Sequence, residues 1–318
     1  MDYTTELFHY GTIALTVSVN ALSVGIGDGI VSLAALKAMN TQPSAQSEIF
    51  KTMLLGMALI ETTAVIGLIV SLMLLPPLPI GTSEYAYYAE LGIAFAICIA
   101  GGVVGYVSAL PAQDACHSVA RQPFFSRNIQ LLMLLTQSLM QTPIIFAFII
   151  ALLIKGQLAQ VTTLAESLRL IGSGLCIGVG SIGPSIGLAL FSREVCKSVG
   201  INRQSYSQLF QFTLFSEALI ESPVIFSLLV SLMVLTMRTQ EPFPFIDGIG
   251  FLAASLAMGL GTLGPAISSG QVAARACKQI ALTPQHYGAI AKTSFFAQAL
   301  IETSAIYALI VAFAILFM

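Results

Sequence analysis

The chain consists of four tandem copies of one sequence repeat. Similar strings recur around positions 61, 141, 221 and 302, which are 80, 80 and 81 residues apart. Every repeat contains two long apolar runs. The eight runs cover residues 10–36, 52–75, 91–113, 129–154, 170–192, 209–236, 248–274 and 293–318. About 20 apolar residues in a helix cross a hydrocarbon core of ~30 Å. The pattern therefore predicts an all-α integral membrane protein with eight transmembrane helices.

The composition supports a membrane protein and offers no sign of a nucleic-acid partner. Apolar residues make up 56% of the 318 residues and charged residues 9%, whereas soluble domains carry about 25% charged residues. The mean hydropathy is +0.89. The net charge of −2 says nothing about such a partner, and we expect none.

Two helices per repeat give every copy the same orientation, which predicts four parallel helical hairpins. We place them at residues 1–80, 81–160, 161–240 and 241–318. The first helix of each hairpin is rich in glycine, and small residues let helices approach closely in lipid. One hairpin cannot cover its own small-residue face, so we expect the hairpins to pack side by side and to close into a ring.

The distribution of Lys and Arg predicts the orientation. Ten of the 13 lie in or beside the loops within hairpins: Lys37, Lys51, Arg121, Arg127, Arg193, Lys197, Arg203, Arg275, Lys278 and Lys292. Only Lys155, Arg169 and Arg238 lie in the connections between repeats. Positive residues favour the cytoplasmic side, so we expect cytoplasmic hairpin loops and both chain termini outside.

Three of the four repeats carry a carboxylate in the middle of the second helix. Glu61, Glu221 and Glu302 are equivalent, and Gln141 replaces the acid in the second repeat. A charge at the bilayer centre costs at least ~2.5–3.5 kcal/mol on insertion scales. A purely structural buried hydrogen bond is the alternative, but three acids at one depth without a basic partner favour reversible ion binding. Gln141 cannot ionise, so the second repeat should be a silent site.

Further polar residues recur at fixed spacings from these positions. A hydroxyl follows each one, in the order Thr62, Thr142, Ser222 and Thr303. Thirty-three residues earlier, on the first helix, lie Asp28, Ser108, Leu188 and Ser269. Glu217 lies four residues before Glu221, as a helper acid or as a residue facing a cytoplasmic half-channel. Tyr307, five residues after Glu302, is positioned to hydrogen-bond a carboxylate.

As a set, these features resemble the rotor-ring proteolipid, the c subunit, of rotary ATP synthases. The resemblance rests on the Gly-rich first helix, on a mid-helix Glu followed by Ser or Thr, and on the polar loop with Arg121, Gln122 and Pro123. It extends over essentially the whole chain, four times over. The usual member has one hairpin. Multi-hairpin forms are better known in the V-type family, which is the nearest alternative, although the Gln-Pro loop is more like the F-type.

The resemblance implies a rotor component of an ATP synthase, without a catalytic site or cofactor of its own. It implies that Glu61, Glu221 and Glu302 carry H⁺ or Na⁺, with Thr62, Ser222 and Thr303 as their partners. Asp28 and Ser269 match the polar position on the inner helix, and Leu188 departs from it. We favour H⁺, because one proton needs fewer oxygen donors than Na⁺.

The resemblance also implies the partners: other copies in a ring, the stator with its ion channel, the central stalk on the hairpin loops, and lipid. We expect a multi-pass protein of a bacterial inner membrane. A self-contained secondary transporter or channel is the alternative from another class. Such transporters usually show inverted repeats and broken helices, whereas these repeats are parallel.

Overall fold

The computed structural model describes residues 3–79, 81–237 and 245–318 of the chain. Arg238, which the charge argument used, lies outside the described residues. Within the described ranges every regular element is helical, and eight helical spans are long and apolar enough to cross a membrane. The prediction of an all-α membrane protein is therefore confirmed.

The helices form four hairpins in chain order. The first hairpin contains α1 (Tyr3–Thr41), η1 (Pro43–Ala45) and α2 (Gln46–Leu74). The second contains α3 (Glu84–Val107), α4 (Ala109–Arg121), η2 (Pro123–Phe125), α5 (Ser126–Met140) and α6 (Thr142–Gln157), and η3 (Leu158–Gln160) follows it. The third contains α7 (Leu164–Ile201), η4 (Arg203–Ser205) and α8 (Tyr206–Thr236). The fourth contains α9 (Phe245–Gly261), α10 (Leu263–Leu282), η5 (Pro284–His286) and α11 (Tyr287–Leu316).

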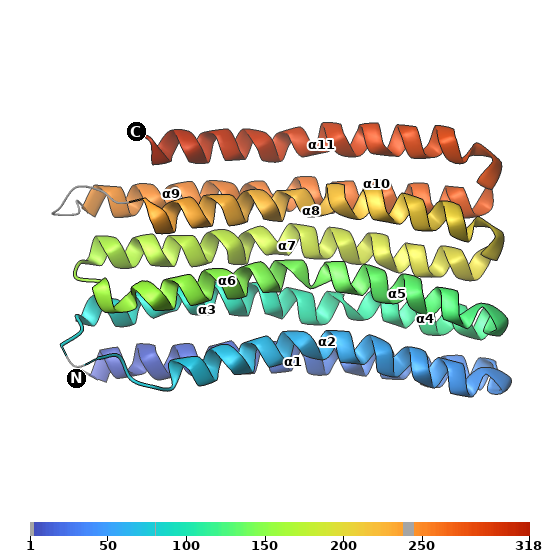
Figure 1. The fold of residues 1–318 in the computed structure, drawn as a ribbon, viewed down its shortest axis with the longest axis horizontal. Helices are drawn as coiled ribbons and strands as arrows, with labels where there is room; N and C mark the ends of the chain where they lie inside the picture. The colour runs from blue at the N-terminus through green and yellow to red at the C-terminus, as the bar shows by residue number, and fades with distance from the viewer. Residues whose placement is uncertain (1–2, 80, 238–244) are drawn as a thin grey trace.

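The hairpins lie side by side in the order of the sequence (Figure 1). One end of the array carries both chain termini and is called here the terminal end. The other end carries the tight turns within hairpins and is called here the loop end. The first helices of the hairpins, α1, α3–α4, α7 and α9–α10, contact one another in an inner row. The second helices, α2, α5–α6, α8 and α11, form the outer row.

Three of the eight spans are interrupted at a single residue, which the apolar pattern did not reveal. The breaks fall at Ser108, Gln141 and Thr262, two or three residues before Pro111, Pro143 and Pro265. Proline has no N–H, so the carbonyl four residues earlier loses its helical donor. Two further prolines, Pro184 and Pro223, lie inside continuous helices.

Side-chain hydroxyls supply some of the missing donors. Pro184 frees the carbonyl of Gly180. The hydroxyl of Thr262 in the next hairpin lies 3.2 Å from this carbonyl and 2.8 Å from that of Gly259 in its own helix, and it can donate to either. Similar bonds between hairpins run from Ser23 to the carbonyl of Gly102 and from Ser167 to that of Tyr85, at 2.7 and 2.6 Å. Water is absent from the hydrocarbon core, so backbone groups must find such partners within the protein.

Glycine allows the inner helices to approach backbone to backbone. A Cβ placed on Gly174 of α7 would collide with the backbone of Gly92 on α3. A Cβ on Gly270 of α10 would collide in the same way with Gly187 on α7. These contacts join the second hairpin to the third and the third to the fourth, which confirms the lateral packing expected from the small residues.

We predict that Gly174→Ala weakens the protein, although alanine is intrinsically the better helix former by about 1 kcal/mol. Overpacking of a tight contact costs about 1–3 kcal/mol, so the added methyl group should lower the thermal stability. Gly156→Ala is the matched control, because a Cβ there meets no atom within 4 Å. Thermal unfolding in detergent measures both variants. Equal or higher stability of Gly174→Ala would contradict the role assigned to this contact.

Candidate functional site

The four equivalent positions lie in the middle of the outer helices. Glu61 lies on α2, Glu221 on α8 and Glu302 on α11, while Gln141 occupies the break between α5 and α6. Their exposure differs: Gln141 is buried, with 5% of its surface exposed, Glu221 and Glu302 are half-buried, and Glu61 is exposed. Glu61 belongs to the first hairpin, which has no preceding hairpin within the chain.

Three of the four site side chains, those of the second, third and fourth hairpins, meet a hydroxyl from the preceding hairpin. Ser222 of the third hairpin contacts Oε1 of Glu302 in the fourth. Thr142 of the second hairpin is a hydrogen-bond partner of Glu221 in the third. Thr62 of the first hairpin lies 3.0 Å from Oε1 of Gln141 in the second, and Thr63 lies 3.2 Å from it. The hydroxyls of Thr62, Thr142 and Ser222 therefore serve the next hairpin, which the sequence alone could not assign.

These hydroxyls also contact the backbone of their own helix. Thr62, Ser222 and Thr303 donate to the carbonyl oxygens of Leu59, Leu219 and Leu300 at 2.7, 2.8 and 2.6 Å. The carbonyl of Leu219 is the one that Pro223 leaves without a helical donor. A hydroxyl has one hydrogen, so Thr62 and Ser222 can each donate either to their own helix or to Oε1 of the side chain in the next hairpin. When Ser222 donates to its own helix, its lone pairs face Glu302 and suit a protonated carboxyl group or a cation better than a carboxylate anion.

The polar position on the inner helix is not used in the same way in every hairpin. Asp28 on α1 is half-buried and interacts electrostatically with Glu61. Ser269 lies 3.4 Å from Oε1 of Gln298, one turn from Glu302. Leu188 is fully buried in the apolar core. The expected inner-helix partner is therefore near the acid in the first hairpin, while Ser269 serves a neighbouring position in the fourth.

Two expected site residues lie at the open side of the fourth hairpin. Tyr307 is 65% exposed on α11. Thr303 donates to its own helix, and among the described residues no following hairpin offers it a carboxyl group. Within the single chain these two side chains are not brought together with a Glu.

A layer of buried polar residues lies one turn nearer the loop end, and the sequence analysis singled out only Glu217 among them. Gln137 donates to the carbonyl of Ser108 at 2.8 Å, and Gln298 donates to Ser294 at 3.0 Å. Both glutamines and Glu217 are fully buried. The repeat spacing relates all three, because each lies four residues before a site position, but it did not show that they are buried together with hydrogen-bond partners.

A buried pair at the terminal end was also missed. Nδ1 of His9 on α1 lies 2.9 Å from Oε2 of Glu90 on α3, and both side chains are buried. The pair joins the first hairpin to the second. It does not recur in the other repeats, because positions equivalent to His9 are Ala89, Arg169 and Gly250, so the spacing gave no signal for it.

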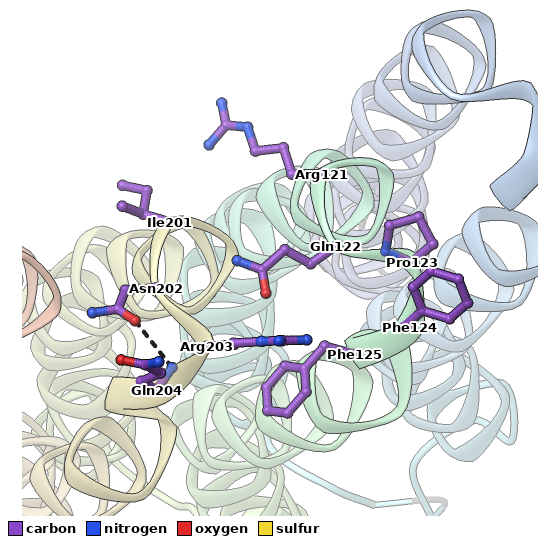
Figure 2. Close-up of a pocket in the computed structure, with 9 residues that line it drawn as sticks. All are labelled: Arg121, Gln122, Pro123, Phe124, Phe125, Ile201, Asn202, Arg203 and Gln204. Carbon is purple, nitrogen blue, oxygen red and sulfur yellow. Dashed lines mark hydrogen bonds between the residues drawn. The ribbon is translucent and has the colours of Figure 1, made fainter.

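The loop end carries an open hollow between the second and third hairpins, with a volume of about 600 Å³. It is lined by residues 121–125 of one loop and 201–204 of the next. Figure 2 shows Gln122 and Arg203 directed into the hollow and Arg121 directed away from it. Gln122 donates to the carbonyl of Gly200 at 2.9 Å, which fixes one loop against the next hairpin. The basic rim suits an acidic protein surface.

Comparison with known proteins gives a match to one family in every hairpin. The chain matches the family of the ATP synthase C subunit at residues 12–74, 91–154, 171–234 and 252–315. It is 44% identical over 66 residues to the ATP synthase c subunit 2 of Cereibacter sphaeroides, a stretch covering 21% of this chain and 80% of that protein. Over 74 residues it is 39% identical to the chloroplastic ATP synthase c subunit of Emiliania huxleyi, covering 23% and 90%. Over 66 residues it is 41% identical to the ATP synthase c subunit of Thermotoga maritima, covering 21% and 78%.

The parallel hairpins and the recurring mid-helix acid define a multi-pass membrane proteolipid of the rotor-ring class, rather than an enzyme. The family match extends over most of the chain, and the chain belongs to the ATP synthase c-subunit family. Each similar protein is about as long as one hairpin, so this chain corresponds to four fused copies of such a protein.

We predict that Ser222→Ala acts on Glu302 rather than on Glu221. With its hydrogen on the carbonyl of Leu219, Ser222 accepts a hydrogen bond from a protonated Glu302, so its removal destabilises that form by ~1 kcal/mol, the net value of one hydrogen bond. Carbodiimides react with protonated carboxyl groups, so labelling of Glu302 at neutral pH should slow about fivefold. Mass spectrometry of the labelled peptides measures both acids. A change at Glu221 with none at Glu302 would contradict the assignment of Ser222 to the following hairpin.

Proposed function

We propose that the chain forms the ion-carrying rotor ring of a rotary ATP synthase, with Glu61, Glu221 and Glu302 as the carriers. The observation that carries this proposal is the repeated contact between a hydroxyl of one hairpin and the site side chain of the next. Each site is thus shared by two hairpins. A carboxyl group held in this way can be neutral while it faces lipid and ionise where a stator offers a polar channel.

The two open ends of the array are complementary. Glu61 in the first hairpin lacks a hydroxyl from a preceding hairpin, and Thr303 in the fourth lacks a following carboxyl group. A head-to-tail neighbour supplies both, and repeated head-to-tail contacts close into a ring when the rotation allows it. At that junction Thr303 and Tyr307 of one copy meet Glu61 and Asp28 of the next. The number of hairpins in the ring is then a multiple of four.

We propose H⁺ as the ion. Ser222 can donate its hydrogen to the carbonyl of Leu219, and a protonated Glu302 then completes the hydrogen bond between the two side chains. Na⁺ needs several oxygen ligands, and the third hairpin offers the buried Leu188 at the inner-helix position. Five side chains remain the proposed hydrogen-bonding groups: Asp28, Ser269, Thr62, Ser222 and Thr303. The alternative is Na⁺ bound at the three Glu residues.

The partners follow from the two surfaces that such a ring exposes. The outer helices present the acids to lipid and to the channel-forming part of the stator. The basic hairpin loops face the cytoplasm, where the hollow between residues 121–125 and 201–204 suits an acidic part of the central stalk. A bacterial inner membrane fits this orientation. The three interrupted spans are a feature that self-contained transporters share, but the parallel repeats and the similarity to the c subunits of ATP synthases favour a rotor ring, and the F-type over the V-type.

One experiment on the purified oligomer tests both the ring and the ion. Native mass spectrometry should give a whole number of 33.6 kDa chains, and images should show a central annulus. Carbodiimide should label Glu61, Glu221 and Glu302. Raising the pH should protect all three, and millimolar Na⁺ at fixed pH should not. A monomer without an annulus would overturn the ring, and protection by Na⁺ at all three sites would overturn the choice of H⁺.

The silent second hairpin sets the ion-to-ATP ratio. A ring of n chains carries 3n ions per turn, because Gln141 replaces one acid in four. Gln141→Glu should add a fourth labelled residue and raise the ratio by about a third, from 3n to 4n, if coupling survives. The ratio is measured from the equilibrium between ATP hydrolysis and the proton gradient in vesicles.

Two kinds of variant control this prediction. Gln141→Leu should leave transport nearly unchanged, because the position carries no ion. Glu61→Gln, Glu221→Gln and Glu302→Gln should each impair rotation, because each lengthens the uncharged arc that must pass the stator. Abolished transport in Gln141→Leu together with tolerance of Glu302→Gln would refute the assignment of carriers and spacer.

A further inference from the structure

The third hairpin contains a second buried acid that the proposed ion cycle does not use. Glu217 lies on α8, one helical turn from Glu221 toward the loop end, and its side chain is fully buried. It is absent from the salt bridges found among the described residues. The groups that interact with it are Ser192 and Cys196 of α7 and Glu221 of its own helix, none of which is a cation.

The two oxygens of Glu217 have different surroundings. Oε1 lies 3.2 Å from the hydroxyl of Ser192, which donates to it. Oε2 is buried and has no hydrogen-bond partner. A buried carboxylate with one donor and one unpartnered oxygen is costly, whereas a carboxylic acid with its hydrogen on Oε2 is a neutral donor.

The neighbouring hairpins show what a neutral donor does at this position. Glutamine occupies it in the second and fourth hairpins, as Gln137 and Gln298. The amide of Gln137 donates to the carbonyl of Ser108 at 2.8 Å and faces that of Gly56 at 3.4 Å. A protonated Glu217 carries an O–H at this position, although its Oε2 has no acceptor within hydrogen-bond distance in the structure, whereas an ionised Glu217 supplies no donor at all.

The inner helix offers the acid a donor that the two hairpins with glutamine lack, although the first hairpin also has a serine here, Ser32, opposite Met57. Position 192 is Ser in the third hairpin, and the equivalent residues opposite the two glutamines are Ala112 and Ala273. Glu217 has a second oxygen where glutamine has an amide nitrogen. Ser192 therefore provides a hydroxyl that donates to the carboxyl group. The matched pair of Ser192 and Glu217 distinguishes this hairpin from the two that carry glutamine.

We propose that Glu217 is a second proton-binding site, which exchanges its proton with the carrier Glu221. The two acids are four residues apart, so they lie on one face of α8 with a rise of ~6 Å between them. In the exchange the O–H bond at Glu217 breaks and an O–H bond forms at Glu221, directly or through a hydroxyl. The negative charge moves from Glu221 to Glu217, and no other reactant is needed. This inference rests on the proposed function only in taking Glu221 as a carrier.

The consequence of such a site is protection of the third hairpin against charge in lipid. If Glu221 leaves the stator without a proton, Glu217 supplies one from the interior. The charge then lies between α7 and α8 near the hydroxyl of Ser192, rather than against hydrocarbon. A carboxylate in hydrocarbon is the less favourable of the two states.

Infrared spectroscopy of the intact ring tests the proposal. The spectrum of the Glu217→Gln ring is subtracted from that of the unaltered ring. The difference should show one C=O stretch of a protonated carboxylic acid. The same band should remain after carbodiimide has modified the three carriers. The variant places the residue of the second and fourth hairpins in the third, so the ring should form. Absence of the band, or a carboxylate band in its place, would overturn the proposal.

Deuterium exchange of the same band tests the connection to Glu221. Replacing Glu221 by Gln should slow the exchange about tenfold or more, equivalent to at least ~1.4 kcal/mol in the barrier. Glu302→Gln is the matched control and should leave the exchange rate unchanged. An exchange rate unaffected by Glu221→Gln would overturn the relay. The labelling of the three carriers is measured separately, so failure of the proposed function and failure of this inference are distinguishable.

Discussion

The close contact between the inner helices is the constraint on which the rest of the structure depends. Lipid gives no hydrophobic driving force for helices to associate, so association needs close packing and hydrogen bonds. The backbone contacts of Gly174 with Gly92 and of Gly270 with Gly187 allow no side chain between the helices. Because these contacts fix the height of one hairpin against the next, the hydroxyl of Ser222 meets the carboxyl group of Glu302. The site geometry on the outer row therefore follows from the packing of the inner row.

Much of the fold could be predicted from the sequence, because the repeat and the lipid both restrict the possibilities. The length of the apolar runs required transmembrane helices, and the even number of helices per repeat required parallel hairpins. The interruptions at Ser108, Gln141 and Thr262 could not be predicted, because Pro184 and Pro223 lie in continuous helices. In both continuous helices a hydroxyl lies within hydrogen-bond distance of the carbonyl that proline frees: Thr262 near that of Gly180 and Ser222 near that of Leu219.

The acids and hydroxyls of the candidate site could be predicted from the sequence, but the side chains that they contact could not. The repeat spacing alone identified Glu61, Glu221 and Glu302 as candidate site residues, together with the hydroxyl residue that follows each of them. It could not show that a hydroxyl serves the following hairpin, because that depends on which face of the outer helix meets its neighbour. Ser269 is an example. Its position 33 residues before Glu302 predicted a contact with that acid, but its hydroxyl lies near Gln298 instead. The pair of His9 and Glu90 was missed because it occurs once, and a repeat analysis detects only what recurs.

Fusion of four hairpins in one chain gives each position a fixed neighbour, and this permits the hairpins to differ. The second hairpin has no acid at its site, the third has an additional acid at Glu217, and the first has Asp28 near Glu61. If such hairpins were separate chains, two silent ones could assemble side by side and leave a long uncharged arc. In the fused chain Gln141 always lies between the site of Glu61 and that of Glu221. The uncharged interval is thus limited to one hairpin in four, and differences that would be harmful in a random assembly become tolerable in a fixed order.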